Sequence, residues 1–206
     1  MSFRYLLFDL DGTLTDPKEG ITKSVQYALA AFGVEEPDLD RLTCFIGPPL
    51  VDSFMEFYGF DREKARQAQA KYRERFAEKG IFENRVLPGI PELLRRLAGA
   101  GRVLALATSK PEVFAEKILE RYGLAAYFTQ TVGSGLDGSL GTKAEVIVEA
   151  LRRLKLSPEE KRQVLMIGDR KHDIAGAKAC GVASLGVRFG YAEEGELEAA
   201  GADFIA

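Results

Sequence analysis

Short runs of apolar residues, each ending at a polar residue, recur near the start of the chain and through its second half. Three of them predict buried parallel strands, at Tyr5–Phe8, Val103–Ala107 and Val164–Ile167. Strands that are covered on both faces are apolar at every position, whereas half-exposed strands alternate. A weaker run predicts a further strand at Ala183–Val187.

Apolar residues at helical spacing follow several of these runs. They predict helices at Pro111–Tyr122, Lys143–Leu154 and Ile174–Cys180. The second of these helices is preceded by Thr142 and carries Glu145 in its first turn, which is the pattern of a capping box. The alternation of strands and helices predicts an α/β fold with a doubly wound, Rossmann-like parallel sheet.

One interval is too long for this alternation. A strand, its crossover helix and the next strand need about 30 residues, yet nearly three times that number separates Phe8 from Val103. The patterns inside the interval predict only helices, at Glu19–Phe32, Leu50–Tyr58 and Arg62–Glu78. We therefore expect an all-helical inserted domain at residues 16–85, and a core domain made of residues 1–15 and 86–206.

The core domain resumes with a helix after Pro88 and Gly89. Leu93, Leu94 and Leu97 are predicted to form its apolar face. The inserted helices carry Arg73 and Arg75, which we expect to be solvated, the alternative being that they reach a substrate anion.

Composition and charge narrow the possible partners. The 206 residues are 46% hydrophobic and 29% charged, which is typical of a folded globular protein. The formal net charge of −3 gives no general attraction to nucleic acid or to anionic membranes, so neither is an expected partner. The oligomeric state is left open by the sequence.

The cysteines and the first apolar run bear on location. Cys44 and Cys180 are isolated and the chain has a single histidine, so the sequence supports neither a disulfide framework nor a zinc site. The first apolar run meets Asp9 and Asp11 after four residues, which is too short and too acidic for a signal peptide. A reducing cytoplasm is the expected location.

Polar residues that could take part in catalysis or ligand binding follow the predicted strands. Asp9, Thr108 and Asp169 each come at or just after a strand end, where open parallel sheets bind their ligands. The first cluster reads Asp9-Leu10-Asp11-Gly12-Thr13, with two carboxylates and a glycine that permits a sharp bend. Lys143 opens a helix, where a cation opposes the helix dipole, so an anion nearby would explain it.

These motifs together resemble the haloacid dehalogenase-like superfamily of phosphatases. Asp9–Thr13 matches its DxDGT motif, Thr108 and Lys143 match its second and third motifs, and Gly168–Asp173 matches its GDxxxD motif. The helical insert resembles the cap of phosphoglycolate phosphatase-like and 5'-nucleotidase-like members. The stretches Ile46–Leu50 and Tyr191–Asp203 also resemble that subgroup.

The residue types suit a two-step phosphoryl transfer. A carboxylate can attack phosphorus and hold the phosphoryl group, which gives Asp9 the role of nucleophile. Asp11 lies two residues further on, on the same side of an extended chain, and can protonate the leaving oxygen and then deprotonate water. Positive charge from Lys143 would let the two anions meet.

The resemblance also implies a metal site and a phosphate site. Mg²⁺ would be held by Asp9, by the carbonyl of Asp11 and by Asp169, with Asp173 acting through water, and oxygen ligands are those that Mg²⁺ prefers. The phosphate would be held by Lys143, by the hydroxyl of Thr108 and by backbone N–H groups near Ser109 at a helix start.

Several alternatives remain open. The expected substrate is a small phosphate ester, either 2-phosphoglycolate or a nucleoside 5'-monophosphate, with the insert limiting access to the strand ends. Rival functions are a sugar phosphomutase, a dehalogenase and a non-enzymatic phosphoacceptor switch. Lys110 is ambiguous, because it either contacts substrate phosphate or projects into water. His172, the single histidine, is expected to have no catalytic role.

Overall fold

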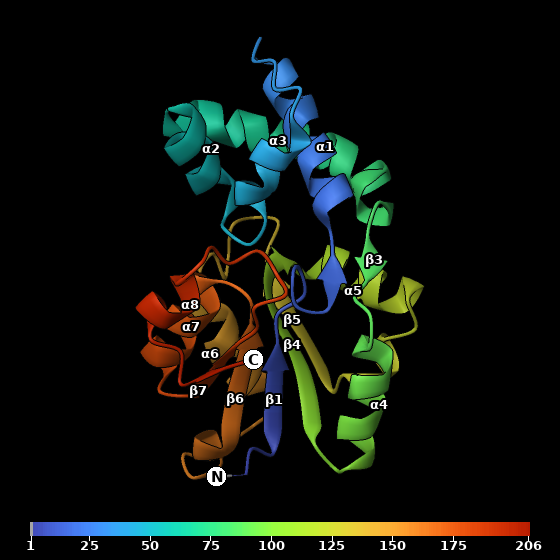
Figure 1. Cartoon of the computed structure of the whole chain (residues 1–206), viewed down its shortest axis with the longest axis vertical. Coiled ribbons are helices and arrows are strands. Elements are labelled where there is room, and N and C mark those ends of the chain that lie inside the picture. The colour runs from blue at the N-terminus through green and yellow to red at the C-terminus, as the bar shows by residue number, and fades with distance from the viewer. Residues whose placement is uncertain (1) are drawn as a thin grey trace. The chain divides into compact units, whose positions relative to one another are not determined.

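The apolar runs form one parallel sheet of six strands in the computed structural model, which describes residues 2–206 (Figure 1). The strand order is β5-β4-β1-β6-β7-β8, so the chain winds outward from β1 in both directions. The doubly wound α/β prediction is confirmed. The strands are β1 (Tyr5–Phe8), β4 (Val103–Pro111), β5 (Gln130–Ser134), β6 (Val164–Gly168), β7 (Ala183–Gly186) and β8 (Phe204–Ile205).

Helices cover both faces of this sheet (Figure 1). Tyr5 and Leu7 of β1 share a buried cluster with residues of α6 and α7, while α4 and α5 lie against the other face. Leu94 of α4 is fully buried but Leu93 is 43% exposed, so its placement on the apolar face was wrong. The helices are α4 (Ile90–Gly99), α5 (Glu112–Arg121), α6 (Lys143–Arg153), α7 (Lys171–Cys180) and α8 (Glu196–Ala200), with 3₁₀ turns η3 (Ala125–Tyr127) and η4 (Glu160–Gln163).

The register of the central strands determines where polar side chains meet. Phe8, the last residue of β1, is paired with Leu106 of β4 on one side and with Ile167 of β6 on the other. β1 and β6 therefore end at the same edge of the sheet, and β4 continues past it to Pro111. Asp9, which follows Phe8, lies at the middle of that edge.

A second compact unit comprises Pro17–Arg85, and the core unit comprises the chain up to Asp16 together with Val86–Ala206. Two short paired strands, β2 (Thr15–Asp16) and β3 (Arg85–Val86), stand at the sequence boundaries between the units. The second unit, called the helical unit below, contains α1 (Lys18–Ala30), η1 (Leu39–Phe45), α2 (Leu50–Tyr58), α3 (Arg62–Glu78) and η2 (Gly80–Phe82).

Aromatic side chains fill the interior of the helical unit. Phe54 is fully buried, with its ring centroid 5.0 Å from that of Phe45 and 5.9 Å from that of Phe60. Tyr72 and Phe76 stack at 5.2 Å along α3. Such packing explains these residues without any ligand.

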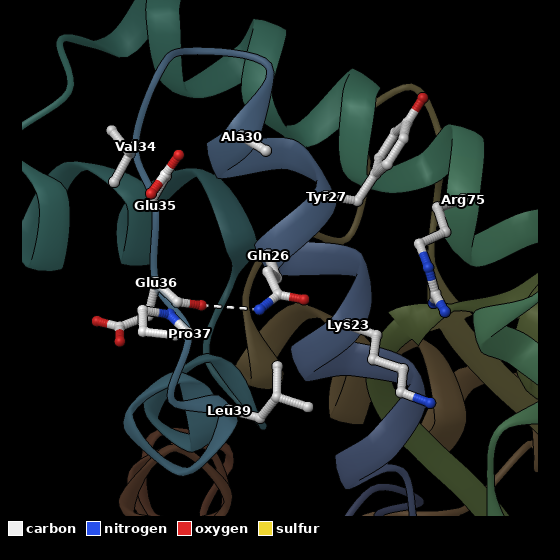
Figure 2. A pocket seen from close by; sticks show the side chains of 10 residues that line it. All are labelled: Lys23, Gln26, Tyr27, Ala30, Val34, Glu35, Glu36, Pro37, Leu39 and Arg75. Atoms are coloured by element: carbon white, nitrogen blue, oxygen red, sulfur yellow. Dashed lines mark hydrogen bonds between the residues drawn. The ribbon is translucent and has the colours of Figure 1, made fainter.

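An open pocket of about 640 Å³ lies on the helical unit, between α1 and the segment that follows it (Figure 2). Arg75 of α3 lines one side, where it donates to Glu83 at 2.8 and 2.9 Å and to Ser24 at 3.1 Å. The Arg75 side chain is only 17% exposed, so the expectation that it is solvated was wrong. Among the described residues, no helix is both long enough and apolar enough to cross a membrane.

Candidate active site

A tight turn follows β1 and carries the two acidic residues of the first motif. Asp9 is 4% exposed and Asp11 is 7% exposed. Gly12 adopts a φ of 82°, and a Cβ there would lie 2.1 Å from Oδ2 of Asp169. Only glycine fits, both because of this backbone conformation and because Asp169 comes so close.

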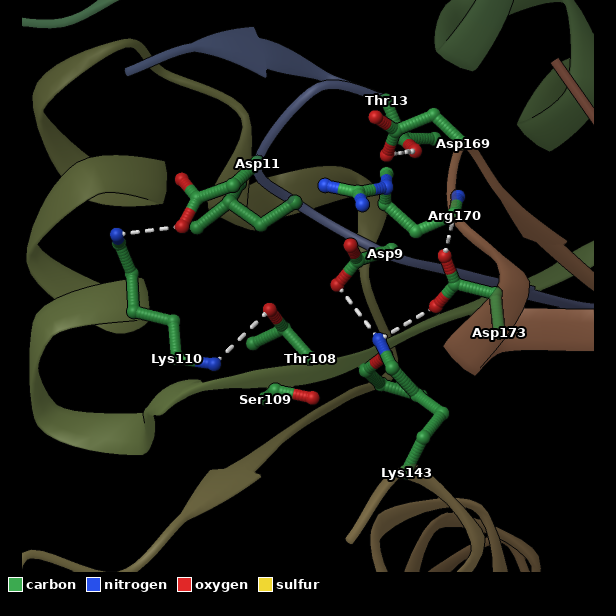
Figure 3. A network of polar contacts seen from close by, with 12 residues as sticks. Asp9, Asp11, Thr13, Thr108, Ser109, Lys110, Lys143, Asp169, Arg170 and Asp173 are labelled. Atoms are coloured by element: carbon green, nitrogen blue, oxygen red, sulfur yellow. Dashed lines mark hydrogen bonds and ion pairs between the residues drawn. The ribbon is translucent and has the colours of Figure 1, made fainter. Parts of the chain in front are cut away.

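Lys143 lies between two carboxylates (Figure 3). Its Nζ is 2.8 Å from Oδ1 of Asp9 and 2.7 Å from Oδ1 of Asp173, and it donates to the carbonyl of Ala107 at 3.0 Å. The predicted capping box of Thr142 and Glu145 is confirmed, and it places Lys143 as the first residue of α6.

Burial opposes the charge on Lys143, but the contacts with Asp173 and Asp9 outweigh it and raise the pKa of the amine above its ordinary value. The side chain is 4% exposed and permanently cationic at neutral pH. The cation at a helix start therefore has the anionic neighbours that its position requires.

Three carboxylates gather at the ends of β1 and β6. Asp9, Asp169 and Asp173 each offer an oxygen, and these oxygens lie within 4.8 Å of one another. Asp169 is fully buried, and its two oxygens accept hydrogen bonds from the hydroxyl of Thr13 at 3.0 Å and from the backbone N–H of Tyr191 at 2.7 Å. Burial, with Asp173 and Asp9 nearby, raises the pKa of Asp169 to about 8.

This cluster fits a hard divalent cation. Its donors are carboxylate oxygens, which Mg²⁺ and Ca²⁺ prefer, and Lys143 alone does not balance three negative charges. Burial also raises the pKa of Asp173, despite the opposing effect of Lys143. A bound cation would remove the cost of holding these carboxylates ionised in a buried site.

Asp11 belongs to a separate ion pair. Its Oδ2 accepts a hydrogen bond from Nζ of Lys110 at 2.6 Å, and both side chains are buried (Figure 3). Its Oδ1 is buried with no hydrogen-bond partner. Burial raises the pKa of Asp11, although Lys110 acts in the opposite direction. Lys110 is therefore buried against a carboxylate and does not project into water, while its contact with substrate phosphate stays a prediction.

The residues after the second predicted strand continue that strand. β4 extends through Pro111, and α5 begins only at Glu112, so the expectation that Ser109 lies at a helix start was wrong. Thr108 is 1% exposed, and its hydroxyl accepts from the backbone N–H of Lys110 at 3.3 Å. Thr108 directly follows Ala107, whose carbonyl binds Lys143, so it lies beside the Asp9 pair.

Two further residues support the acidic cluster, and the sequence did not indicate either role. The hydroxyl of Tyr191 forms a very short hydrogen bond with Asp16, while its N–H holds Asp169. Glu196 accepts from Nε of Arg170 at 2.9 Å and from the N–H of Lys171 at 2.7 Å, at the start of α7. These contacts join segments that are far apart in the sequence, so they could not be predicted before the fold was known.

His172 lies in the first turn of α7. Burial, together with Arg170 and Lys171, lowers the pKa of its imidazole below the ordinary value. Among the described residues, the ion pairs of Asp9, Asp11 and Lys143 do not involve His172.

Comparisons with known proteins agree with this geometry. A family model described as haloacid dehalogenase-like hydrolase matches residues 6–187. A 5'-nucleotidase of Pseudomonas aeruginosa is 53% identical over 94% of this chain and 86% of its own length. A phosphoglycolate phosphatase of Vibrio parahaemolyticus is 30% identical over 98% of this chain and 91% of its own length.

Two other matches complete the picture. A tyrosine-protein kinase of Mycobacterium tuberculosis, PtkA, is 39% identical over 90% of this chain, which spans only 62% of that protein. The crystal structure of a predicted phosphatase from Clostridium acetobutylicum superposes with a TM-score of 0.95 and is 49% identical, over 100% of this chain and 94% of the other.

Proposed function

Because the chain belongs to the haloacid dehalogenase-like hydrolase family and is a phosphoric monoester hydrolase, we propose that it works through an aspartyl-phosphate on Asp9. The observation that carries this proposal is the buried contact of Asp9 with Lys143, beside Asp169 and Asp173. A carboxylate in this setting faces positive charge, as a nucleophile for an anionic phosphate must.

Asp9 attacks phosphorus while Asp11 gives a proton to the leaving oxygen. The P–O bond to the leaving group breaks, an alcohol departs, and the phosphoryl group stays on Asp9 as a mixed anhydride. Asp11 then takes a proton from water, which attacks the same phosphorus and releases inorganic phosphate and the Asp9 carboxylate. General acid–base help of this kind is worth about 10²- to 10⁴-fold in rate.

The remaining residues hold charge in place. Lys143 binds Asp9 and offsets the negative charge of the transferring group, and the hydroxyl of Thr108 and the backbone near Ser109 hold phosphate oxygens. Asp9, the Asp11 carbonyl and Asp169 would hold Mg²⁺, with Asp173 through water, and the ion would supply positive charge opposite the phosphoryl oxygens.

The proposed substrate is a nucleoside 5'-monophosphate or 2-phosphoglycolate. The relative named 5'-nucleotidase is 53% identical and the one named phosphoglycolate phosphatase is 30% identical, which favours the nucleotide. Measuring kcat/KM for both compounds, for sugar phosphates and for a phosphotyrosyl peptide tests this order, since the ratio reports transition-state discrimination. A preference for the peptide would contradict a small-molecule substrate.

Transfer to an acceptor other than water is the second candidate, because one relative is named a tyrosine-protein kinase. A mutase or kinase would move phosphate without releasing it. Release of one inorganic phosphate for each ester consumed, in the presence of sugar phosphates or tyrosyl peptide, is the expected result. Isomerised sugar phosphate or phosphorylated peptide in place of phosphate would establish the transferase.

We also propose a cytoplasmic location. Neither Cys44 nor Cys180 forms a disulfide bond among the described residues, and burial raises the pKa of the Cys180 thiol, which makes it less reactive. Fractionation of the source cells, with the protein followed by antibody, tests this assignment, and recovery in a membrane or external fraction would contradict it.

A further inference from the structure

The edge of the sheet holds a second lysine–carboxylate pair besides that of Asp9 and Lys143. Nζ of Lys110 is 2.6 Å from Oδ2 of Asp11, and the two side chains are 5% and 10% exposed. Two such charges are costly to bury, and each is tolerated because the other compensates it. The proposed steps above give Lys110 no role.

The backbone that carries Lys110 is fixed from the neighbouring strand. The register of β4 against β5 shifts between Ala107 and Pro111, on either side of Lys110. The hydroxyl of Ser134 donates to the carbonyl of Ser109 at 2.9 Å. A Cβ on Gly133 would lie 2.5 Å from the carbonyl oxygen of Lys110, so the two backbones approach as closely as glycine allows.

The two oxygens of Asp11 differ in their surroundings. Oδ2 accepts the hydrogen bond from Lys110, whereas Oδ1 is buried with no partner. A buried acceptor that makes no hydrogen bond costs about 1–3 kcal/mol. The open oxygen is therefore the one that is ready to meet a group on a substrate.

We propose that Lys110 is a positioning residue that holds Asp11 by Oδ2 and so makes Oδ1 the oxygen that exchanges the proton. The ammonium group of Lys110 occupies Oδ2, so Oδ1 is the oxygen left to face the leaving group. In the proposed steps, the proton passes from Oδ1 to the ester oxygen as the P–O bond breaks, and a proton from water returns to Oδ1. The inference rests on the proposed role of Asp11 as acid and base.

A series of esters with different leaving groups tests the inference. The probes are p-nitrophenyl phosphate, phenyl phosphate and an alkyl phosphate, and the readout is kcat/KM, which covers the steps up to transfer to Asp9. Lys110→Met should lower kcat/KM about 10- to 100-fold for the alkyl ester, where the leaving oxygen needs a proton. For p-nitrophenyl phosphate, whose leaving oxygen needs none, the loss should stay below about 3-fold.

Lys117→Met is the matched control, because Lys117 is an exposed lysine on α5, and it should leave the whole series unchanged. Inhibition by inorganic phosphate should also be the same in Lys110→Met and wild type. Equal losses for all esters, together with weaker phosphate inhibition, would show that Lys110 binds phosphate itself, and would overturn the inference.

The double variant Asp11→Asn with Lys110→Met covers the case in which Lys110→Met does not fold, since it leaves no unpaired buried charge. If Lys110 acts through Asp11, the double variant should match Asp11→Asn within about 2-fold across the series. A further loss in the double variant would overturn the positioning role.

The same series separates the two proposals. In Asp11→Asn, the loss in kcat/KM should be large for the alkyl ester and small for p-nitrophenyl phosphate, which is a steep dependence on the leaving group. Uniform losses in Asp11→Asn would remove Asp11 as the acid and the inference with it. A steep dependence in Asp11→Asn with none in Lys110→Met would overturn the role of Lys110 alone.

Discussion

The core unit and the helical unit bury different kinds of polar group. Among the described residues, every buried charged side chain belongs to the core unit, and these residues follow β1 or β6, lie near the end of β4, or open α6 and α7: Asp9, Asp11, Lys110, Lys143, Asp169, Arg170 and Asp173. The fully buried polar side chains of the helical unit are the hydroxyls of Thr22, Ser24 and Ser53.

Each hydroxyl of the helical unit has a hydrogen bond to a carbonyl close by in the sequence, and that of Ser24 also accepts from Arg75 at 3.1 Å. Each lies within hydrogen-bond distance of the carbonyl one turn earlier in its own helix, at 2.7 Å for Thr22, 2.6 Å for Ser24 and 3.2 Å for Ser53. Buried ion pairs, in contrast, are often no more stable than apolar packing. The buried charges of the core unit are therefore not explained by stability alone, and the proposed chemistry gives them a role, whereas the aromatic interior of the helical unit is explained by packing.

Asp9→Asn should give the largest effect. We expect kcat to fall about 10³-fold or more, because the amide cannot form the covalent intermediate. Asp61→Asn is the matched change in the helical unit, where Asp61 is exposed and caps α3, and asparagine caps a helix equally well. Steady-state assays should find Asp61→Asn within about 2-fold of wild type. Near wild-type activity in Asp9→Asn would contradict the assignment of Asp9 as the nucleophile.

Asp169→Ala should act on the metal requirement. Exhaustive EDTA should abolish activity and Mg²⁺ should restore it, because the acidic cluster holds uncompensated negative charge. In Asp169→Ala the Mg²⁺ concentration for half-maximal activity should rise about 10²-fold, or turnover should be lost. Titration of activity with Mg²⁺ measures the shift, and activity that survives EDTA would contradict the metal site.

Gly20→Ala tests packing in the helical unit. A Cβ on Gly20 would lie 2.0 Å from the carbonyl oxygen of Gly80, so α1 and η2 would have to separate. We expect the free energy of unfolding to fall by about 1–3 kcal/mol, with an unchanged Mg²⁺ requirement. Gly99→Ala is the control, since nothing lies near its Cβ position. Denaturant melts measure both, and equal stability of the two variants would contradict the close approach.

Glu149→Gln should have the smallest effect, because this charge lies in the core unit but away from the site. Hydrogen bonds from Arg152 and Arg153 lower the pKa of Glu149 to about 2. The ionised carboxylate therefore stabilises the fold fully when the pH is above the ordinary pKa of a glutamate. This contribution is lost as the pH falls through about 2. Arg152 is 71% exposed, so water screens the pair and its loss should cost less than about 1 kcal/mol at neutral pH. Melts at pH 7 measure this, and a loss of several kcal/mol would contradict the screening.

Some strands could be predicted from the sequence and some could not. Tyr5–Phe8 matches β1 residue for residue, because a run that is apolar at every position indicates burial on both faces. β5 was missed, because Gln130–Ser134 contains a single fully buried large apolar residue, Val132, and gains its strand conformation from pairing with β4.

Some residues of the candidate site could likewise be predicted from the sequence, and others could not. Asp9 and Asp169 could be predicted because each follows a strand end of the sheet, whereas Thr108 was identified by its motif and lies within β4. The partner of Lys110 could not, because Asp11 is 99 residues away and the contact depends on the irregular register of β4. Tyr191 and Glu196 likewise reach the site only through tertiary contacts.

Trapping the phosphorylated protein is the most direct test of the proposed aspartyl-phosphate on Asp9. The protein is mixed with a small phosphomonoester and Mg²⁺, quenched in acid within one turnover, and examined by mass spectrometry of the intact chain and its peptides. If Asp9 is the nucleophile, we expect one added phosphoryl group on the peptide that contains Asp9, removed by hydroxylamine, and none in Asp9→Asn. Phosphate on another residue, or full turnover with no phosphorylated protein at any quench time, would contradict the account.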